Sequence, residues 1–346
     1  MDNTREQPVM TDTEAEAGAP PPGKGQKASP GPASRPPKFQ NRAAFWLLAP
    51  SMLLLAVVIG YPVVSAVAMS FQQDPVLNEQ GFFAPGGFAG FGNYIAWIFQ
   101  QCPAAEGTQS CPAGTLGAQF WEATGNTFFF TIVTVILETI IGFWMAVIMA
   151  RTFRGRGLVR AAVLVPWAIP TAVTAKLFFF MFAFDGVINK TFGTAILWTG
   201  EEWPAKFAII IADTWKTTPF MALLILAGLQ MIPKEVYEAA KVDGTTAWQR
   251  FRMITLPMVK PALMVAILFR TLDALRMFDL PFILTGGANG TTTLSILVID
   301  QIRSGFNLAS ALSTITFLVI FLVAFIFVRF LGANAVESAT GNRKGK

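Results

Sequence analysis

Eight ionisable side chains fall within stretches of the sequence that are otherwise apolar. Four are acidic and four are basic: Glu138, Lys176, Asp213, Lys216, Arg270, Asp273, Arg276 and Asp279. A charge at the centre of a membrane-spanning helix costs about 2.5–3.5 kcal/mol on insertion scales, so each group must face another charge, a backbone carbonyl or water. Arg270 and Asp273 are three residues apart, as are Asp213 and Lys216, and each pair can therefore share one helix face.

Two interpretations of these charges stay open on the sequence alone. In the first, some of them line a polar pathway for a solute, and the aromatic rings of Trp167, Trp215 and Phe220 pack against that solute. In the second, they form ion pairs that hold helices together. We expect ion pairing for most of these residues taken singly, and contact with the pathway for at least one of them.

Other kinds of chemistry find little support. The sequence has no histidine, which removes the commonest metal ligand and the usual general base, and we expect no metal site. Residues 18–24 match the G-x-x-x-x-G-K start of a phosphate-binding loop, but Gly25 stands where a Ser or Thr must bind Mg²⁺. We therefore expect no ATP hydrolysis by this chain.

The apolar blocks predict a membrane protein. Hydrophobic residues make up 53% of the chain and charged residues only 14%, against about a quarter charged in soluble proteins. Six blocks exceed the ~20 residues that a helix needs to cross the hydrocarbon layer. They run from about 43–71, 126–150, 158–184, 205–232, 261–284 and 308–331. The sequence therefore predicts an all-α transmembrane domain over 42–335, with a disordered tail at 1–41 and a short tail at 336–346.

Lysine and arginine between the blocks predict the orientation of the chain. Basic residues concentrate in the N-terminal tail, after the second and fourth blocks and in the C-terminal tail. The connections on the other side carry only Lys190, Lys206 and Arg303. Because cytoplasmic loops are enriched in Lys and Arg, both termini are expected in the cytoplasm. The net charge of +5 thus reflects membrane topology and does not indicate nucleic-acid binding.

Two cysteines, Cys102 and Cys111, lie in the first loop on the outer side. Disulfides persist in oxidising compartments, and a closed ring would stabilise a loop rich in Gly and Pro. We favour a disulfide over two free thiols, with a structural role in either case.

The segment 233–257, between the fourth and fifth blocks, predicts a short helix–turn–helix at the membrane surface. Pro233 is suited to the start of a helix, and Gly244 can adopt the positive φ that ends it. Thr245 or Thr246 can cap the next helix, which Pro257 is expected to end. The residues alone leave two readings open: a docking element for a cytoplasmic partner, or an ordinary amphipathic loop.

The same segment resembles the cytoplasmic motif of ABC-importer permeases, which is Glu-Ala-Ala, three residues, Gly, nine residues, Ile, one residue and Leu-Pro. Every fixed position is filled, by Glu238, Ala239, Ala240, Gly244, Ile254, Leu256 and Pro257. The resemblance covers about residues 42–335. It is extended by the segments 268–279 and 285–287 and by 215–220, which are similar to the sugar permeases of the maltose and trehalose type. The resemblance implies the type I importer permease fold, with 233–257 as the coupling helix segment.

This resemblance implies a complex of known kind. It contains a second permease, two ATPase subunits that bind ATP and Mg²⁺, and an extracellular substrate-binding protein; this chain binds no cofactor itself. The chain would form half of the pathway for a sugar, such as trehalose or maltose, across a bacterial cytoplasmic membrane. The implied coupling residues are the motif positions and Asp243. The candidate pathway residues are Glu138, Trp167, Trp215, Lys216, Phe220, Arg270, Asp273 and Asp279.

Three alternatives remain on the sequence. A secondary transporter or channel would work without an ATPase and would be expected to show inverted repeats. A membrane-embedded enzyme ranks last, because the sequence lacks histidine and a paired carboxylate motif outside the membrane. Among importers, other substrates such as glycerol phosphodiesters, polyols and amino acids stay open.

Overall fold

The computed structural model describes residues 38–77, 81–84, 86–103 and 107–329. Two units divide the chain, Met1–Ala56 and Val57–Lys346. The described part of the first unit consists of α1 (Lys38–Leu55) and the first residue of a π-helical turn, η1 (Ala56–Gly60). The expected tail 1–41 thus overlaps the start of α1 at Lys38, and the tail 336–346 lies outside the described residues.

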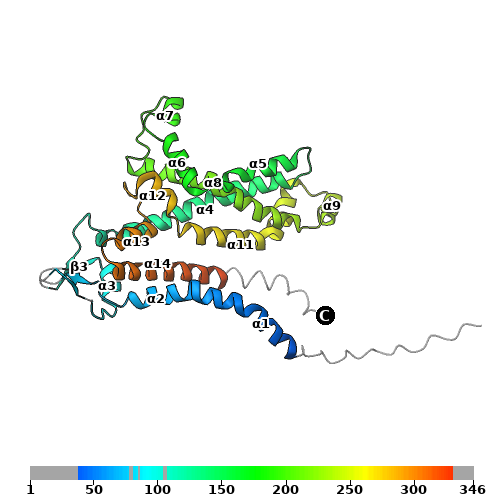
Figure 1. The fold of residues 1–346 in the computed structure, drawn as a ribbon. Coiled ribbons are helices and arrows are strands. Elements are labelled where there is room, and N and C mark those ends of the chain that lie inside the picture. Colours follow the sequence, from blue (N-terminus) through cyan, green and yellow to red (C-terminus); the bar gives the residue numbers. More distant parts are fainter. Residues whose placement is uncertain (1–37, 78–80, 85, 104–106, 330–346) are drawn as a thin grey trace, which may run out of the picture. The chain divides into compact units, whose positions relative to one another are not determined.

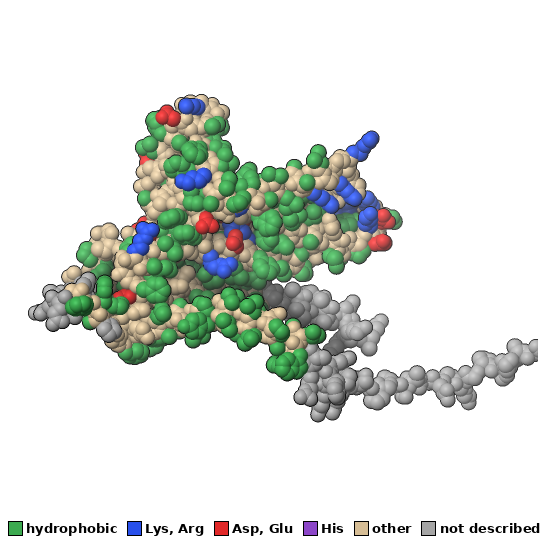
Figure 2. Space-filling view, in the orientation of Figure 1, with side chains coloured by type: hydrophobic (Ala, Val, Ile, Leu, Met, Phe, Trp, Pro, Cys, Tyr) green, Lys and Arg blue, Asp and Glu red, His purple; other side chains and the backbone are tan. Residues whose placement is uncertain are grey.

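Within the described residues, five helical runs are long and apolar enough to cross a membrane. They are Phe45–Met69, Leu116–Ala150, Glu202–Gln230, Ala247–Ala274 and Phe306–Phe327. Two helices bent by 87° at a short break, Arg156–Ala168 and Thr171–Met181, pass the same test together and bring the number to six when the pair is counted as one span. The predicted all-α class with six spans is therefore confirmed, and one of the six is broken. Figure 2 shows hydrophobic side chains spread over the surface of the helices, as expected for helices that contact lipid.

The break in the third span lies at a proline. Helix α5 (Arg156–Ala168) ends before Ile169, which is extended, and α6 (Thr171–Met181) begins after Pro170. A proline disfavours helical geometry in the residue before it and has no N–H to donate. Pro166 and Pro219, by contrast, lie inside α5 and α8 (Glu202–Gln230), which continue through them.

The fifth span differs from the predicted 261–284. A continuous helical run starts at Ala247 and passes through α10 (Ala247–Arg250), the π-turn η3 (Phe251–Thr255) and α11 (Leu256–Ala274). Pro257 does not end a helix; it follows the π-turn η3 directly, at the second residue of α11, where the regular α-helical hydrogen-bond ladder is already interrupted. The run ends at Ala274, and the residues expected to finish the span form the separate helix α12 (Asp279–Thr285).

The remaining elements are two long helices, α4 and α14, and several short ones. They are α2 (Tyr61–Met69), α3 (Gly92–Ile98), η2 (Leu116–Gln119), α4 (Phe120–Ala150), α7 (Val187–Phe192), α9 (Lys234–Val242), α13 (Leu294–Ile302) and α14 (Phe306–Phe327). Two small hairpins lie before α4: β1 (Val76–Leu77) pairs with β2 (Phe83–Ala84), and β3 (Gln101–Pro103) pairs with β4 (Thr108–Ser110).

The β3–β4 hairpin contains the two cysteines. Cys102 lies opposite Gln109, and Cys111 follows β4 directly. The structure joins the two cysteines in a disulfide. Gly117 lies so close that a Cβ there would be 2.5 Å from the Cys111 sulfur, so this part of the loop packs tightly around the bond.

The core of the second unit is built on α4, α8 and α11, which pack against one another (Figure 1). Helices α5 and α6 contact α8, α12 contacts α6, and both α2 and α13 contact α14. One apolar cluster near the α9 end of α8 joins α4, α8 and α11 through Phe143, Met221, Ile225 and Val259. This packing positions the buried charges that lie further along the same three helices.

Two glycines allow these helices to approach closely. A Cβ at Gly142 of α4 would lie 3.0 Å from the Met221 Cβ of α8. A Cβ at Gly228 of α8 would lie 2.3 Å from the Ala262 Cβ and 3.1 Å from the Val259 Cγ2, both in α11. Small residues at such crossings let helix backbones come close in membranes.

We expect Gly228→Leu to destabilise the protein by about 1–3 kcal/mol, because the added side chain must push α8 and α11 apart. Thermal unfolding of the detergent-solubilised protein measures the loss. Gly125→Leu is the matched control, because a Cβ at Gly125 meets nothing within 4 Å. Equal stability of the two variants would show that the α8–α11 contact is not tight.

Candidate functional site

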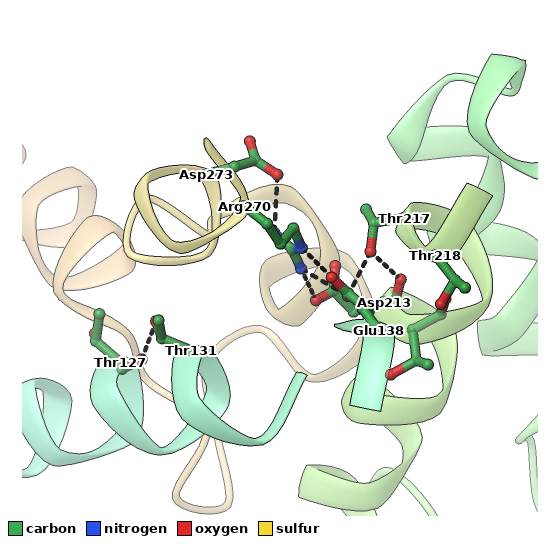
Figure 3. A network of polar contacts seen from close by, with 9 residues as sticks. Thr127, Thr131, Glu138, Asp213, Thr217, Thr218, Arg270 and Asp273 are labelled. Atoms are coloured by element: carbon green, nitrogen blue, oxygen red, sulfur yellow. Dashed lines mark hydrogen bonds and ion pairs between the residues drawn. The ribbon is translucent and has the colours of Figure 1, made fainter. Parts of the chain in front are cut away.

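A single guanidinium, that of Arg270, lies between three helices and is almost completely buried at 1% exposure. Its Nε and Nη2 donate to the two carboxylate oxygens of Glu138 in α4, with Nη2 at 3.0 Å from Oε1. Nη2 also donates to Asp213 of α8, and Nη1 donates to Asp273 Oδ2 at 2.8 Å. Figure 3 shows the side chain of Arg270 reaching from α11 to both buried carboxylates.

Hydroxyl groups complete this cluster. Thr217, four residues after Asp213, donates from its Oγ1 to the Glu138 carboxylate and to the Asp213 main-chain carbonyl. Thr217 lies in the segment 215–220 but was not among the candidate pathway residues. It lies on the same helix face as Asp213, one turn further on.

The cluster contains more negative than positive groups. One guanidinium faces three carboxylates. Glu138 and Asp213 are buried, whereas the Asp273 side chain is 67% exposed although it lies within a membrane span. A charged carboxylate in contact with lipid carries a large free-energy cost. Asp273 must therefore face water, a solute or another protein.

The two pairs that can share a helix face differ in their partners. Arg270 and Asp273 form an ion pair with each other. Asp213 instead pairs with Arg270, and the Lys216 ammonium donates to the main-chain oxygen of Ile169 at 2.6 Å. Ile169 lies at the break between α5 and α6, where its carbonyl has no helical N–H partner. Lys216 thus stabilises the bent span.

The candidate aromatic residues do not gather around the charges. Trp167 stacks on Phe220, with ring centroids 5.7 Å apart. Trp215 packs edge-on against Phe178 and lines an apolar cavity of about 510 Å³ between α4, α5 and α8. The predicted pathway set is therefore split: Glu138, Arg270 and Asp273 lie together, whereas the three rings lie elsewhere.

Further charges are exposed beside Asp273. Arg276 and Asp279 follow the end of α11 and are both exposed. Figure 2 shows acidic and basic side chains close together in this part of an otherwise hydrophobic surface. Lys176 is also exposed, with its ammonium 5.4 Å from the ring centre of Phe179.

The segment 233–257 folds as a helix, a tight turn and a second helix. Pro233 precedes α9, and Gly244 has a φ of +74°. Thr246 and Gln249 form a reciprocal capping box at the start of α10. The helix start at Pro233, the turn at Gly244 and a threonine cap were predicted from the residue types, whereas the role of Gln249 was not.

Side-chain contacts fix the angle between the two helices. The Tyr237 hydroxyl lies 3.0 Å from the Thr255 hydroxyl. The Thr245 hydroxyl donates to the Ala240 carbonyl at 2.6 Å, and Arg250 donates to the Thr245 carbonyl.

The motif residues of this segment differ in exposure. Ala240 is buried, whereas Glu238, Ala239 and Asp243 are exposed. Val242, at the end of α9, is 88% exposed although it is apolar. Ile254 lies in η3, and Leu256 and Pro257 begin α11. The outer face of α9 is thus uncovered among the described residues, and the contacts of Tyr237, Thr245 and Arg250 hold α9 against the following helix.

Comparison with known proteins identifies the class to which this fold and segment belong. Residues 138–336 match the family described as binding-protein-dependent transport system inner membrane component. The chain belongs to this family. It is therefore a multi-pass inner-membrane protein and a transport component, and the predicted family is confirmed.

Individual relatives cover most of the chain. The trehalose transport system permease protein SugA of Mycobacterium tuberculosis is 37% identical, over 86% of this chain and 91% of its own length. The trehalose/maltose transport system permease protein MalF of Thermococcus litoralis is 36% identical, over 84% of this chain and 94% of its own length.

Solved structures show the same fold. A subunit of a bacterial ABC transporter that imports the acidic polysaccharide alginate superimposes with a TM-score of 0.67 at 19% identity. The match covers 84% of this chain and 96% of that chain. The expected type I importer permease fold is thereby confirmed.

We expect Arg270→Gln to destabilise the protein by about 3–5 kcal/mol, because Glu138 and Asp213 would remain buried without their cation. Thermal unfolding in detergent measures this loss. Asp273→Asn is the control and should unfold close to wild type, since its side chain is mostly exposed. Adding Glu138→Gln to Arg270→Gln should recover part of the loss; a wild-type midpoint for Arg270→Gln alone would contradict the structural role.

Proposed function

We propose that this chain is a permease subunit of an ATP-driven sugar importer and forms half of a pathway for a disaccharide such as trehalose or maltose. The names of the two relatives support this substrate class, because both are described as trehalose or trehalose/maltose permeases. The family supports an importer that depends on a binding protein rather than a secondary transporter or an enzyme.

The observation that carries the proposal is the exposed face of α9, which side-chain contacts hold in a fixed orientation to the following helix. We propose that α9 docks on a cytoplasmic ATPase, with Glu238, Ala239, Ala240, Asp243 and Gly244 as contact or turn residues. The exposed apolar tip at Val242 supports docking, since a large apolar side chain in water favours a partner surface. Ile254, Leu256 and Pro257 join α9 to the transmembrane helix α11, so that a movement of α9 is transmitted to the span.

The proposed partners follow from this arrangement. A second permease would supply the other half of the pathway, and two ATPase subunits would bind ATP and Mg²⁺. An extracellular binding protein would deliver the sugar, as supported by an alginate transporter solved with its substrate-bound periplasmic protein. ATP-driven closure of the ATPases would then move the coupling helices and change the side to which the cavity opens.

Asp273 is the best-placed pathway residue in this proposal. Its carboxylate is exposed on the surface of the unit and is oriented by Arg270, which is itself held by Glu138. A carboxylate in such a position accepts hydrogen bonds from sugar hydroxyl groups. Asp279 is exposed nearby in sequence and can contribute in the same way. Trp167, Trp215, Phe220 and Lys216 are proposed to act through packing of the bent third span and its neighbours.

The orientation is proposed from charge. The connection 151–160 and the segment 233–257 carry most of the basic residues between the spans, which supports a cytoplasmic location for both. Both termini would then be cytoplasmic, and the Cys102–Cys111 loop would lie outside, where the disulfide can persist.

We expect Gly244→Val to abolish substrate-stimulated ATP hydrolysis and sugar uptake by the purified complex. A β-branched residue strongly disfavours a φ of +74°, so the orientation of α9 would be lost. Gly244→Asn is the matched control, because Asn tolerates this conformation, and it should retain most activity. Full coupling in the valine variant would contradict the docking proposal.

A further inference from the structure

A second cavity, of about 780 Å³, lies beside the coupling segment, between the α4–α5 connection and α9–α10. Five basic side chains line it: Arg151, Arg156, Arg160, Lys234 and Arg250. None of its described lining residues is an aspartate or a glutamate. Figure 2 shows the basic side chains gathered at this end of the molecule.

The positive charge of this cavity is not neutralised within the described residues. None of its five basic side chains takes part in an ion pair there. Arg160 donates from Nη2 to the Met149 carbonyl at 2.7 Å, and its Nε is buried with no hydrogen-bond partner among the described residues. Buried donors normally have partners. The unpaired Nε and the excess of cations therefore indicate an anionic ligand.

Aromatic rings form one wall of the same cavity. Phe251 stacks between Trp144, at 5.9 Å, and Trp248, at 5.3 Å between ring centroids. Tryptophan is enriched where membranes meet water, because one part of its ring system is apolar and the other donates a hydrogen bond. The ligand site thus combines cations with an interfacial aromatic surface.

An apolar cavity lies on the same helices further from this end. The 510 Å³ cavity described above is lined by Ile141 and Met145 of α4 and by Val163 and Pro166 of α5. The basic cavity is lined by later residues of α4 and earlier residues of α5. Cations at the membrane surface with apolar space deeper along the same helices suit a molecule that has an anionic head and a hydrocarbon tail.

We propose that the basic cavity binds the phosphate group of an anionic phospholipid from the cytoplasmic leaflet. Basic pockets between membrane helices on the cytoplasmic side recognise such headgroups. The guanidinium groups suit phosphate because they donate paired hydrogen bonds. Since Lys234 and Arg250 belong to the coupling segment and Arg151 and Arg156 to the α4–α5 connection, a bound headgroup joins these two parts of the cytoplasmic surface.

Native mass spectrometry of the full-length chain, purified with the subunits that accompany it, tests this proposal. The complex is delipidated and titrated with dioleoyl phosphatidylglycerol, with dioleoyl phosphatidylcholine or with glycerol 3-phosphate. We expect the anionic lipid to bind in preference to the zwitterionic one, and Arg151→Gln/Arg156→Gln to weaken its binding about 30-fold.

Arg154→Gln/Arg252→Gln is the matched control. This variant also removes two positive charges. Arg154 lies in the α4–α5 connection and Arg252 in the coupling segment, and both side chains are exposed and do not line the cavity. The variant should bind the anionic lipid like wild type. Equal weakening in both variants would overturn the site, since it would indicate general surface attraction. Displacement of the lipid by glycerol 3-phosphate at equal concentration would overturn the lipid assignment and indicate a soluble phosphate ester.

Discussion

Arg270 cannot be buried inside a membrane protein unless carboxylates surround it, and this requirement places α4, α8 and α11 in one arrangement. Glu138 and Asp213 come from different helices, and both reach the same guanidinium. The close crossings at Gly142 and Gly228 bring the three helices near enough for these bonds. Removing Arg270 would leave Glu138 and Asp213 as charges in a medium that cannot solvate them, so the network specifies which helices are neighbours.

The same network reaches the surface of the unit at one point. Asp273 shares Arg270 with two buried carboxylates but remains mostly exposed. The helix that carries it, α11, is continuous through η3 and α10 with the coupling segment. One helical run therefore joins the charged pathway candidate to the turn at Gly244. The bent third span, stabilised by Lys216 at Ile169, packs against α8 from the other side.

The sequence predicted those features that depend on neighbouring residues. Apolar runs gave six spans, and residue types gave the start of α9, the positive φ of Gly244 and the cap of α10. The prediction for Pro257 was wrong because the π-turn η3 precedes it and lets the helical run continue through the proline. The pairing of Arg270 with Glu138, 132 positions away, leaves no local pattern. It depends on helix packing, and so does the separation of Trp167, Trp215 and Phe220 from the charges.

The most direct test is to purify the tagged chain from its native membrane in mild detergent and to identify the accompanying proteins by mass spectrometry. The account predicts a nucleotide-binding ATPase and a second permease in stable amounts. Replacement of Gly244 by valine should remove the ATPase and leave the second permease bound. A chain that purifies alone, and that moves solute into liposomes without ATP, would contradict the role assigned to α9 and with it the proposed importer.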